Sequence, residues 1–403
     1  MPRPRAPDNS GEGDERMPTH PDIVVIGGGV TGCSTLFHLA DLGMKNALLL
    51  ESGPLAGGFT GRSMAILRTH YSNEVTTRLA WDSLKVLERF NDVVGAPSGY
   101  VRTGYLLVAP AIHRKALEQN VAMQRRAGVD AHVLGSGDID AVRDWFAIAD
   151  GEACAYEPQS GFADSYLVTT GYANRAKELG AGVRAGVRVN AIEVKRGRVR
   201  SVQTTIGKIS TDRVVVAAGP WSKPLLAPLK IDLPIGCVRH QVITLHRPAE
   251  ALEEHPTIGD VPNGLSARPD APGMTLVGVR EDPVPSPEEY DHGVDWDVVE
   301  ESSRLLTARM PRLAGAYYRG GWSGLFDVTP DWHPVLSGVE GVEGLYVAAG
   351  FSGHGFKLAP MVGKTMAELA MQTPTTIDVS MLGLGRFATG ELMRSKYPLG
   401  VLA

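Results

Sequence analysis

The sequence predicts a mixed α/β fold in which a parallel, Rossmann-like sheet is assembled from the beginning, middle and end of the chain. Three segments indicate this: residues 22–29 (DIVVIGGG), 211–220 (TDRVVVAAGP) and 344–355 (GLYVAAGFSGHG). Each is a short apolar run that ends in glycine, as buried parallel strands often do. Ligands of open α/β sheets bind outside the carboxyl ends of the strands, so these glycines mark the candidate site.

The first of these turns has the spacing of a dinucleotide-binding turn. Gly27, Gly29 and Gly32 form Gly-x-Gly-x-x-Gly, and residues 30–42 (VTGCSTLFHLADL) follow with apolar residues at helical spacing. Gly27 allows the tight turn, Gly29 lets the backbone approach a pyrophosphate, and Gly32 lets the helix sit close to the strand. The helix start then offers free N–H groups to the phosphates.

An acidic residue stands where the ribose of such a dinucleotide would lie. Glu51 ends the next apolar run, NALLLE, about 20 residues after the glycines, where an acid hydrogen-bonds ribose hydroxyls and disfavours a 2′-phosphate. Gly219 and Gly350 end the two later strands and would let the backbone approach the ligand there. A glycine-rich turn without a ligand, and strands that serve only as core, are the alternatives.

Between the first and last strands, residues 187–219 alternate in the manner of β-strands, with basic or glycine-containing turns between them. Hairpins are the natural interpretation. Such a meander, placed before a returning strand, is atypical of a plain NAD-linked dehydrogenase.

The composition is that of a globular protein, with 43% hydrophobic residues and a net charge of -5. The length of 403 residues suggests two or three domains of typical size, and interleaved domains are the alternative. The mild negative charge gives no case for nucleic-acid binding. No apolar run approaches the roughly 18 residues of a membrane span. Cys33, Cys154 and Cys237 lack disulfide or metal spacing, so we expect a reducing, cytoplasmic setting and no metal site.

The two ends of the chain are expected to be a leader and a tail. Residues 1–20 are rich in proline, glycine and charge and lack the apolar stretch of a secretory signal. We expect a disordered leader, with Met17 as an alternative start. Residues 376–403 are expected to form a C-terminal tail.

Taken together, these features resemble the D-amino-acid oxidase superfamily, and within it the branch of sarcosine oxidases, glycine oxidase and dimethylglycine dehydrogenases. The resemblance covers roughly residues 21–370. The most specific motif is GFSGHGFKLAP (350–360), supported by the segments 61–74, 161–181 and 321–338.

The resemblance implies a discontinuous FAD-binding domain interleaved with a substrate domain on a mixed or antiparallel sheet. The FAD-binding domain is expected to comprise residues 21–100, 160–230 and 320–375. The substrate domain is expected to comprise residues 101–159 and 231–319.

The GFSGHGFKLAP motif precedes a helix-like stretch, and if that helix starts near Lys357 its positive end points at the ligand. A lysine there would favour reduced flavin. Gly353 and Gly355 would leave room for the isoalloxazine ring. The resemblance gives Lys357 a role in binding the substrate carboxylate, and we expect His354 near the flavin, handling substrate or protons.

Arg68 is the second expected anchor, because it lies in the otherwise apolar stretch MAILRTHY. The planar fork of arginine suits a carboxylate held by two parallel hydrogen bonds. In the sarcosine oxidases an arginine at the matching place binds the substrate carboxylate. Arg62 could serve instead, contact the flavin, or form a structural ion pair.

The sequence departs from the sarcosine oxidases at two places. Gly324 stands where those enzymes attach the flavin to a cysteine, so we predict non-covalent FAD, with a histidyl link through His70 as an alternative. Leu276 replaces a lysine that activates oxygen, and Arg280 replaces a histidine. Arg280 could restore the missing positive charge or bind a second acidic group. The final electron acceptor, oxygen or another, stays open.

The resemblance implies oxidation of the C–N bond of a small amino acid or N-alkyl amino acid. A hydride equivalent would pass to flavin N5, and the imine product would be hydrolysed. Two other classes are considered: an NAD-linked dehydrogenase and a non-catalytic FAD-binding assembly protein. Neither the substrate's identity nor the oligomeric state can be inferred from the sequence.

Overall fold

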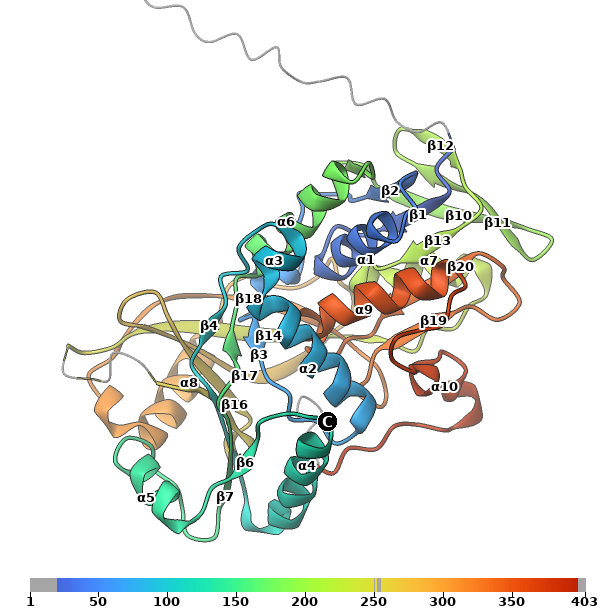
Figure 1. Ribbon diagram of the computed structural model, residues 1–403. Coiled ribbons are helices and arrows are strands. Elements are labelled where there is room, and N and C mark those ends of the chain that lie inside the picture. Colours follow the sequence, from blue (N-terminus) through green and yellow to red (C-terminus); the bar gives the residue numbers. More distant parts are fainter. Residues whose placement is uncertain (1–19, 250, 252–254, 398–403) are drawn as a thin grey trace, which may run out of the picture.

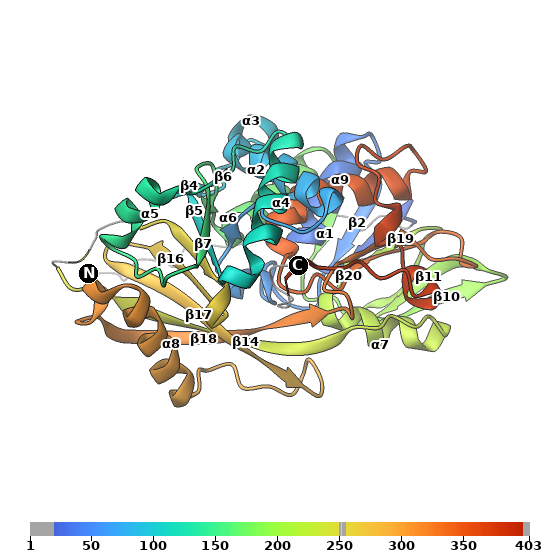
Figure 2. The ribbon, with the colours of Figure 1, turned by 90° about the horizontal axis from the view of Figure 1, so that it is seen from below.

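The computed structural model describes residues 20–249, 251 and 255–397, except for the side chain of Arg280. The expected leader therefore lies, apart from His20, outside the described residues. Figures 1 and 2 show two large sheets side by side, with helices packed on their outer faces. Among the helices of the described residues, none is long and apolar enough to cross a membrane.

The first sheet joins the beginning, middle and end of the chain, as predicted. Val24 pairs with Val214 and Val214 pairs with Leu345, both in parallel. The strand order is β19-β20-β13-β1-β2-β9, and only the edge strand β19 is antiparallel. The strands are β1 (Ile23–Ile26), β2 (Ala47–Leu50), β9 (Gly182–Arg184), β13 (Val214–Val216), β19 (Val335–Gly338) and β20 (Leu345–Ala349).

Helices cover one face of this sheet and a small antiparallel sheet covers the other. The helices are α1 (Val30–Asp41), α2 (Glu74–Glu88), α3 (Phe90–Val94), α6 (Ser165–Glu178) and α9 (Gly355–Ala370). On the opposite face lie β10 (Val189–Lys195), β11 (Arg198–Thr204), β12 (Gly207–Ser210) and α7 (Ser222–Leu226). The three strands form consecutive antiparallel pairs, which confirms the predicted hairpins.

Small residues let α1 approach its neighbours. A side chain at Gly32 would lie 1.9 Å from the carbonyl oxygen of Gly27, so α1 packs directly on the end of β1. A side chain at Gly363 of α9 would lie 2.1 Å from the hydroxyl oxygen of Ser34 on α1. This close packing fixes the starts of both helices relative to the sheet.

The second sheet is mixed, as the resemblance implied, and has the order β18-β14-β17-β16-β15-β5-β7-β6. Only β15 and β5 pair in parallel. Its strands are β5 (Tyr105–Ala109), β6 (His132–Val133), β7 (Ala153–Glu157), β14 (Gly236–His246), β15 (Thr257–Asp260), β16 (Leu265–Asp270), β17 (Met274–Val284) and β18 (Tyr317–Val328). Helices α5 (Ser136–Arg143) and α8 (Trp296–Arg309) cover one face, and α4 (Arg114–Arg126) packs on the other.

One segment lies in a different sheet from the one expected. Residues 320–328 were expected with the FAD-binding part, but they belong to β18. This strand pairs with β14 from Tyr317 opposite His246 to Val328 opposite Gly236. A third, short sheet of β3 (Ile66–Leu67), β8 (Gly161–Phe162) and β4 (Val101–Arg102) completes the fold.

The described part of the expected C-terminal tail is packed against the body. Arg386, in the short helix α10 (Arg386–Thr389), donates hydrogen bonds to both carboxylate oxygens of Asp331, at 2.7 and 3.0 Å. Both side chains are buried. A buried ion pair therefore holds residues 376–397, the described part of the expected C-terminal tail, in place.

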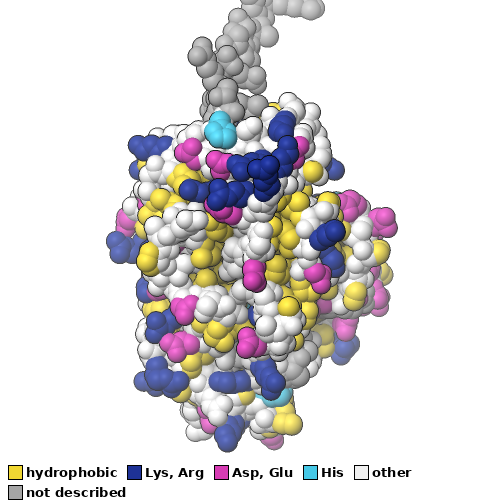
Figure 3. Space-filling view, turned by 90° about the vertical axis from the view of Figure 1, so that its right-hand side faces the viewer, with side chains coloured by type: hydrophobic (Ala, Val, Ile, Leu, Met, Phe, Trp, Pro, Cys, Tyr) yellow, Lys and Arg dark blue, Asp and Glu magenta, His cyan; other side chains and the backbone are white. Residues whose placement is uncertain are grey.

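Basic residues gather on one part of the surface. Figure 3 shows lysine and arginine gathered near the top of the molecule, over β10 to β12. The exposed members are Arg188, Lys195, Arg196, Arg198, Arg200 and Lys208. Several of them pair with acids, including Arg198 with Glu343 at 2.7 Å.

Candidate functional site

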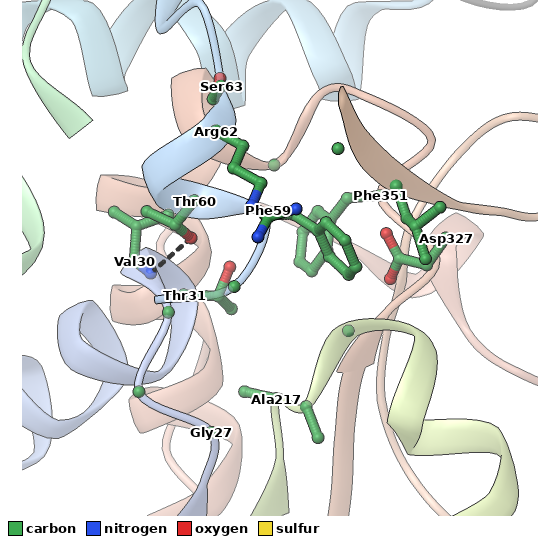
Figure 4. Close-up of a pocket in the computed structure, with 18 of the residues that line it drawn as sticks. Gly27, Val30, Thr31, Phe59, Thr60, Arg62, Ser63, Ala217, Asp327 and Phe351 are labelled. Atoms are coloured by element: carbon green, nitrogen blue, oxygen red, sulfur yellow. Dashed lines mark hydrogen bonds between the residues drawn. The ribbon is translucent and has the colours of Figure 1, made fainter. Parts of the chain in front are cut away.

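A cavity of about 740 Å³ lies between the carboxyl ends of the parallel strands and the second sheet. It is lined by the turn after β1, the segment 57–68, the end of β13, the strands β14 and β18, and the start of α9. Figure 4 shows Gly27, Thr31, Phe59, Arg62 and Asp327 arranged around this space. The segments predicted from the glycine-ended strands therefore meet at one site.

The predicted dinucleotide turn forms one end of the cavity. Gly27 and Gly29 line it, and Gly27 has a φ of +113°, which favours glycine. A side chain at Gly27 would lie 2.3 Å from the carbonyl oxygen of Ala217, so the turn also needs glycine for its approach to β13. Gly32 lies behind the turn and allows the helix to pack closely, which is the role predicted for it.

The start of α1 faces the cavity without a side-chain cap. Gly29 is the N-cap residue and has no side chain to accept a hydrogen bond. The N–H of Val30 donates to the hydroxyl of Thr60 at 3.1 Å (Figure 4). The first N–H groups of a helix have no partner within the helix, so this end can bind an anion such as a pyrophosphate.

Glu51 lines the cavity beside the first turn, where a ribose was predicted. Its carboxylate accepts hydrogen bonds from the N–H of Gly28 at 2.6 Å and of Gly53 at 2.7 Å. Glu51 therefore holds the backbone of the turn by hydrogen bonds and also lines the cavity.

The two later glycines differ in placement. Gly219 lines the cavity, with a φ of +53°. Gly350 does not: a side chain there would lie 2.4 Å from Thr329, and its N–H donates to Asp327 at 2.6 Å. Gly350 serves the turn that follows β20, and its expected ligand contact stays a prediction.

The start of α9 forms the other end of the cavity. The helix begins at Gly355, two positions before the predicted start at Lys357. Gly353, Gly355 and Lys357 all line the cavity. A side chain at Gly353 would lie 3.0 Å from the ring of Phe326, so the loop passes close to β18.

Arg68 and Lys357 come together at this end, and both are buried, with 4% and 7% of their surface exposed. The guanidinium of Arg68 lies 4.6 Å from the ring centre of Tyr71 and donates to the carbonyl of His70. The ammonium of Lys357 is 3.3 Å from the carbonyl oxygen of Gly353. Burial, and then the charge of Arg68, hold the pKa of Lys357 well below its usual value. An anion bound between Arg68 and Lys357 would offset both the burial and the repulsion, and would raise the pKa of Lys357.

His354 lies behind the cavity wall. It is buried, it caps α9, and its Nδ1 lies 3.3 Å from the hydroxyl of Tyr71. Burial, and then the charge of Lys357, lower its pKa well below the ordinary value, which keeps the ring neutral. The lining of the cavity does not include it. The expected direct role in substrate or proton handling is therefore not what this geometry supports.

His70 is also turned away from the cavity. Its Nε2 lies 2.8 Å from the hydroxyl of Tyr397, and the side chain is fully buried. Gly324, which was expected at the place of the family cysteine, lines the cavity, while Leu276 is buried beside Met64. Arg280 belongs to β17, but its side chain lies outside the described residues, so its expected role stays a prediction.

Phe59 and Asp327 are among the cavity residues that sequence reasoning missed. The Asp327 carboxyl is buried, and burial raises its pKa to about 6 although the Gly350 N–H opposes this. The ring of Phe59 stacks on Trp221 with centres 5.5 Å apart. Neither residue lies in a motif, but Asp327 stands four residues before Asp331 in a segment that was singled out.

A third cavity residue, His240, could be anticipated from strand alternation. It lines the cavity together with Val242, two positions further along β14. Its ring stacks on Phe326 with centres 4.8 Å apart. Across residues 20–397, as far as the structure describes them, no cluster of His, Cys, Asp or Glu is arranged to hold a metal ion.

The parallel sheet, the start of α1 without a side-chain cap and the adjoining cavity are the arrangement of a dinucleotide-binding fold. The comparison with known families then gives the particular group. The chain belongs to the family of FAD dependent oxidoreductases, whose description matches residues 22–369. FAD is therefore the cofactor of the family, and the family match favours it over a nicotinamide dinucleotide.

Three relatives illustrate the similarity. The chain is 25% identical to mouse (Mus musculus) mitochondrial sarcosine dehydrogenase over 92% of its length, and 28% identical to human (Homo sapiens) peroxisomal sarcosine oxidase over 91%. It covers 42% of the dehydrogenase, less than half of that protein, but 96% of the oxidase. Among solved structures, L-proline dehydrogenase from P. horikoshii superimposes with a TM-score of 0.84 at 27% identity, covering 92% of this chain and 99% of that one.

Proposed function

We propose that the protein binds FAD non-covalently along the cavity and oxidises the C–N bond of a small amine that bears a carboxylate. The single observation that carries this proposal is the position of Arg68 and Lys357. Two buried cations line the same cavity as the dinucleotide turn, at its opposite end. A scaffold protein has no need of two desolvated cations at this place, because burying them costs free energy.

The residues present fit FAD. The uncapped start of α1 would hold the pyrophosphate and Glu51 the ribose, while Gly353 and Gly355 would leave space for the ring. A side chain at Gly28 would lie 2.7 Å from Leu55, so the turn has no room for anything but glycine. No cysteine is among the described residues that line the cavity, which supports a non-covalent cofactor.

When bound, the flavin supplies a two-electron acceptor for the hydride that leaves the substrate carbon. The guanidinium of Arg68 would hold the carboxylate by two parallel hydrogen bonds, and Lys357 would add a third contact. Fixing the carboxylate orients the C–H bond and supplies much of the rate. Burial and the two cations also lower the pKa of the bound amine, so it loses its proton without a strong base.

The electron acceptor and the location are part of the same proposal. Leu276 stands where oxygen-activating relatives have a lysine, so we propose slow reaction with oxygen and a different natural acceptor. Arg280 could restore part of the missing charge. A cytoplasmic location agrees with three free cysteines, although several relatives are described as mitochondrial or peroxisomal.

An anaerobic screen of amino acids and N-methyl amino acids tests the proposal. We expect at least one of them to bleach the flavin absorbance of the wild-type protein. The variant Arg68→Ala combined with Lys357→Ala should retain FAD and lose this bleaching. Intact bleaching in the double variant would show that the catalytic assignment is wrong, and a failure of all amines with the wild type would favour the non-catalytic class.

A further inference from the structure

We propose that Arg62 forms a second anion subsite in the cavity and receives a second carboxylate of the substrate. This inference rests on the proposed function and narrows its substrate class to amines that carry two carboxylates. Arg62 is half-buried and lines the same cavity as Arg68. In Figure 4 its side chain runs from η1 (Thr60–Arg62) into the space beside Phe59.

The hydrogen-bond partners of Arg62 are all uncharged. One terminal nitrogen donates to the hydroxyl of Tyr290 at 2.6 Å and to the carbonyl of Ser323 at 3.1 Å. The other lies 2.9 Å from Nδ1 of His292, which accepts when the ring is neutral. Within the described residues no carboxylate forms an ion pair with Arg62. The side chain is thus held in a fixed direction, and the described residues supply no counter-ion for its charge.

Three other arginines that make several hydrogen bonds in the interior do meet an acid. Because a guanidinium taken out of water needs a compensating charge, each of these pairs is expected on physical grounds. The pairs are Arg239 with Asp295 at 2.7 Å, Arg309 with Asp260 at 2.7 Å and Arg386 with Asp331 at 2.7 Å. Arg62 differs from them in facing the cavity, where a ligand can supply the missing negative charge.

Apart from Ser63, the cavity-lining residues between Arg62 and Arg68 in the sequence are apolar. Met64 and Ile66 lie between them in the sequence and line the cavity, and they pack with Val242 of β14. A ligand that follows this wall meets a cation, then aliphatic side chains, then a second cation. This order matches a carboxylate, a short run of methylene groups and another carboxylate.

The negative group could also come from a phosphate of the cofactor, since both are oxyanions that an arginine fork binds. The contacts of Arg62 favour the substrate. Arg62 contacts Tyr290, in the segment before α8, and Ser323 of β18. The start of α1, which would hold the phosphates, contacts Thr60 and not Arg62.

Equilibrium binding of simple carboxylates to the FAD-loaded protein tests the subsite without any turnover. The probes are acetate and the dicarboxylates malonate, succinate, glutarate and adipate, each followed by the change in flavin absorbance. We expect one dicarboxylate to bind at least about tenfold more tightly than acetate, which equals about 1.4 kcal/mol. Arg62→Gln should abolish this advantage and leave acetate binding unchanged, and Arg62→Lys should restore part of it.

The matched control is Arg89→Gln, which removes an arginine whose side chain is 71% exposed, far from the cavity lining. The proposal is overturned if no dicarboxylate exceeds acetate, if no probe changes the absorbance, or if Arg62→Gln weakens acetate equally. It is also overturned if Arg62→Gln lowers FAD affinity but keeps the dicarboxylate preference, since the arginine would then serve the cofactor. A dicarboxylate preference without any amine-dependent bleaching would contradict the proposed function and leave the subsite standing.

Discussion

At the scale of single residues, the site combines two cations, whose burial costs free energy, with glycines that leave space for a ligand. Lys357 and Arg68 were predicted from a motif and from an arginine in an apolar run, and both line the cavity. His354 was predicted from the same motif, yet its side chain contacts Tyr71 behind the wall. The motif identifies the helix start, but the direction of each side chain there depends on the helix phase, which the motif alone does not give.

Carboxylate binding should depend on the protonation of Lys357. Its pKa is lowered in the free protein, and a bound carboxylate should raise it. Between these two pKa values binding takes up a proton, so affinity falls as pH rises through that window. Calorimetry of acetate binding in buffers of different ionisation enthalpy measures the uptake. Lys357→Met should remove it, and an unchanged pH dependence in that variant would assign the proton to another group.

At the scale of elements, local signals predicted strands and helix starts well, and long-range pairing poorly. The short apolar run of β1 and the alternation in β10 to β12 are local features, and the strands predicted from them were confirmed. The membership of β18 in the second sheet depends on its long register with β14, which no short pattern reveals. The anchoring of α10 likewise depends on two charged residues far apart in the sequence.

That anchor can be tested through stability. Arg386→Met should lower the free energy of unfolding by about 3–5 kcal/mol, because it leaves the buried carboxylate of Asp331 without its partner. Urea denaturation followed by circular dichroism measures the change. Arg89→Met at an exposed pair should cost less than about 1 kcal/mol. Equal urea midpoints for the two variants would mean that the buried pair of Arg386 and Asp331 stabilises the fold no more than an exposed pair does.

At the scale of the whole molecule, the cavity exists because two sheets meet. The first sheet supplies the dinucleotide turn and the start of α9, and the second supplies β14 and β18. The chain passes between them more than once, so residues distant in sequence share one wall, as Figures 1 and 2 illustrate. The resemblance to a known family predicted this interleaving of the two sheets. Composition and periodicity alone predicted only the parallel half.

The most direct test of the account is a titration of the purified protein with acetate, read in the flavin absorbance. The account predicts one FAD per chain, released by acid precipitation, and a saturable change in the flavin spectrum that Arg68→Ala abolishes. A spectrum indifferent to acetate, or an equal response in Arg68→Ala, would contradict the claim that this cavity holds a carboxylate beside the ring.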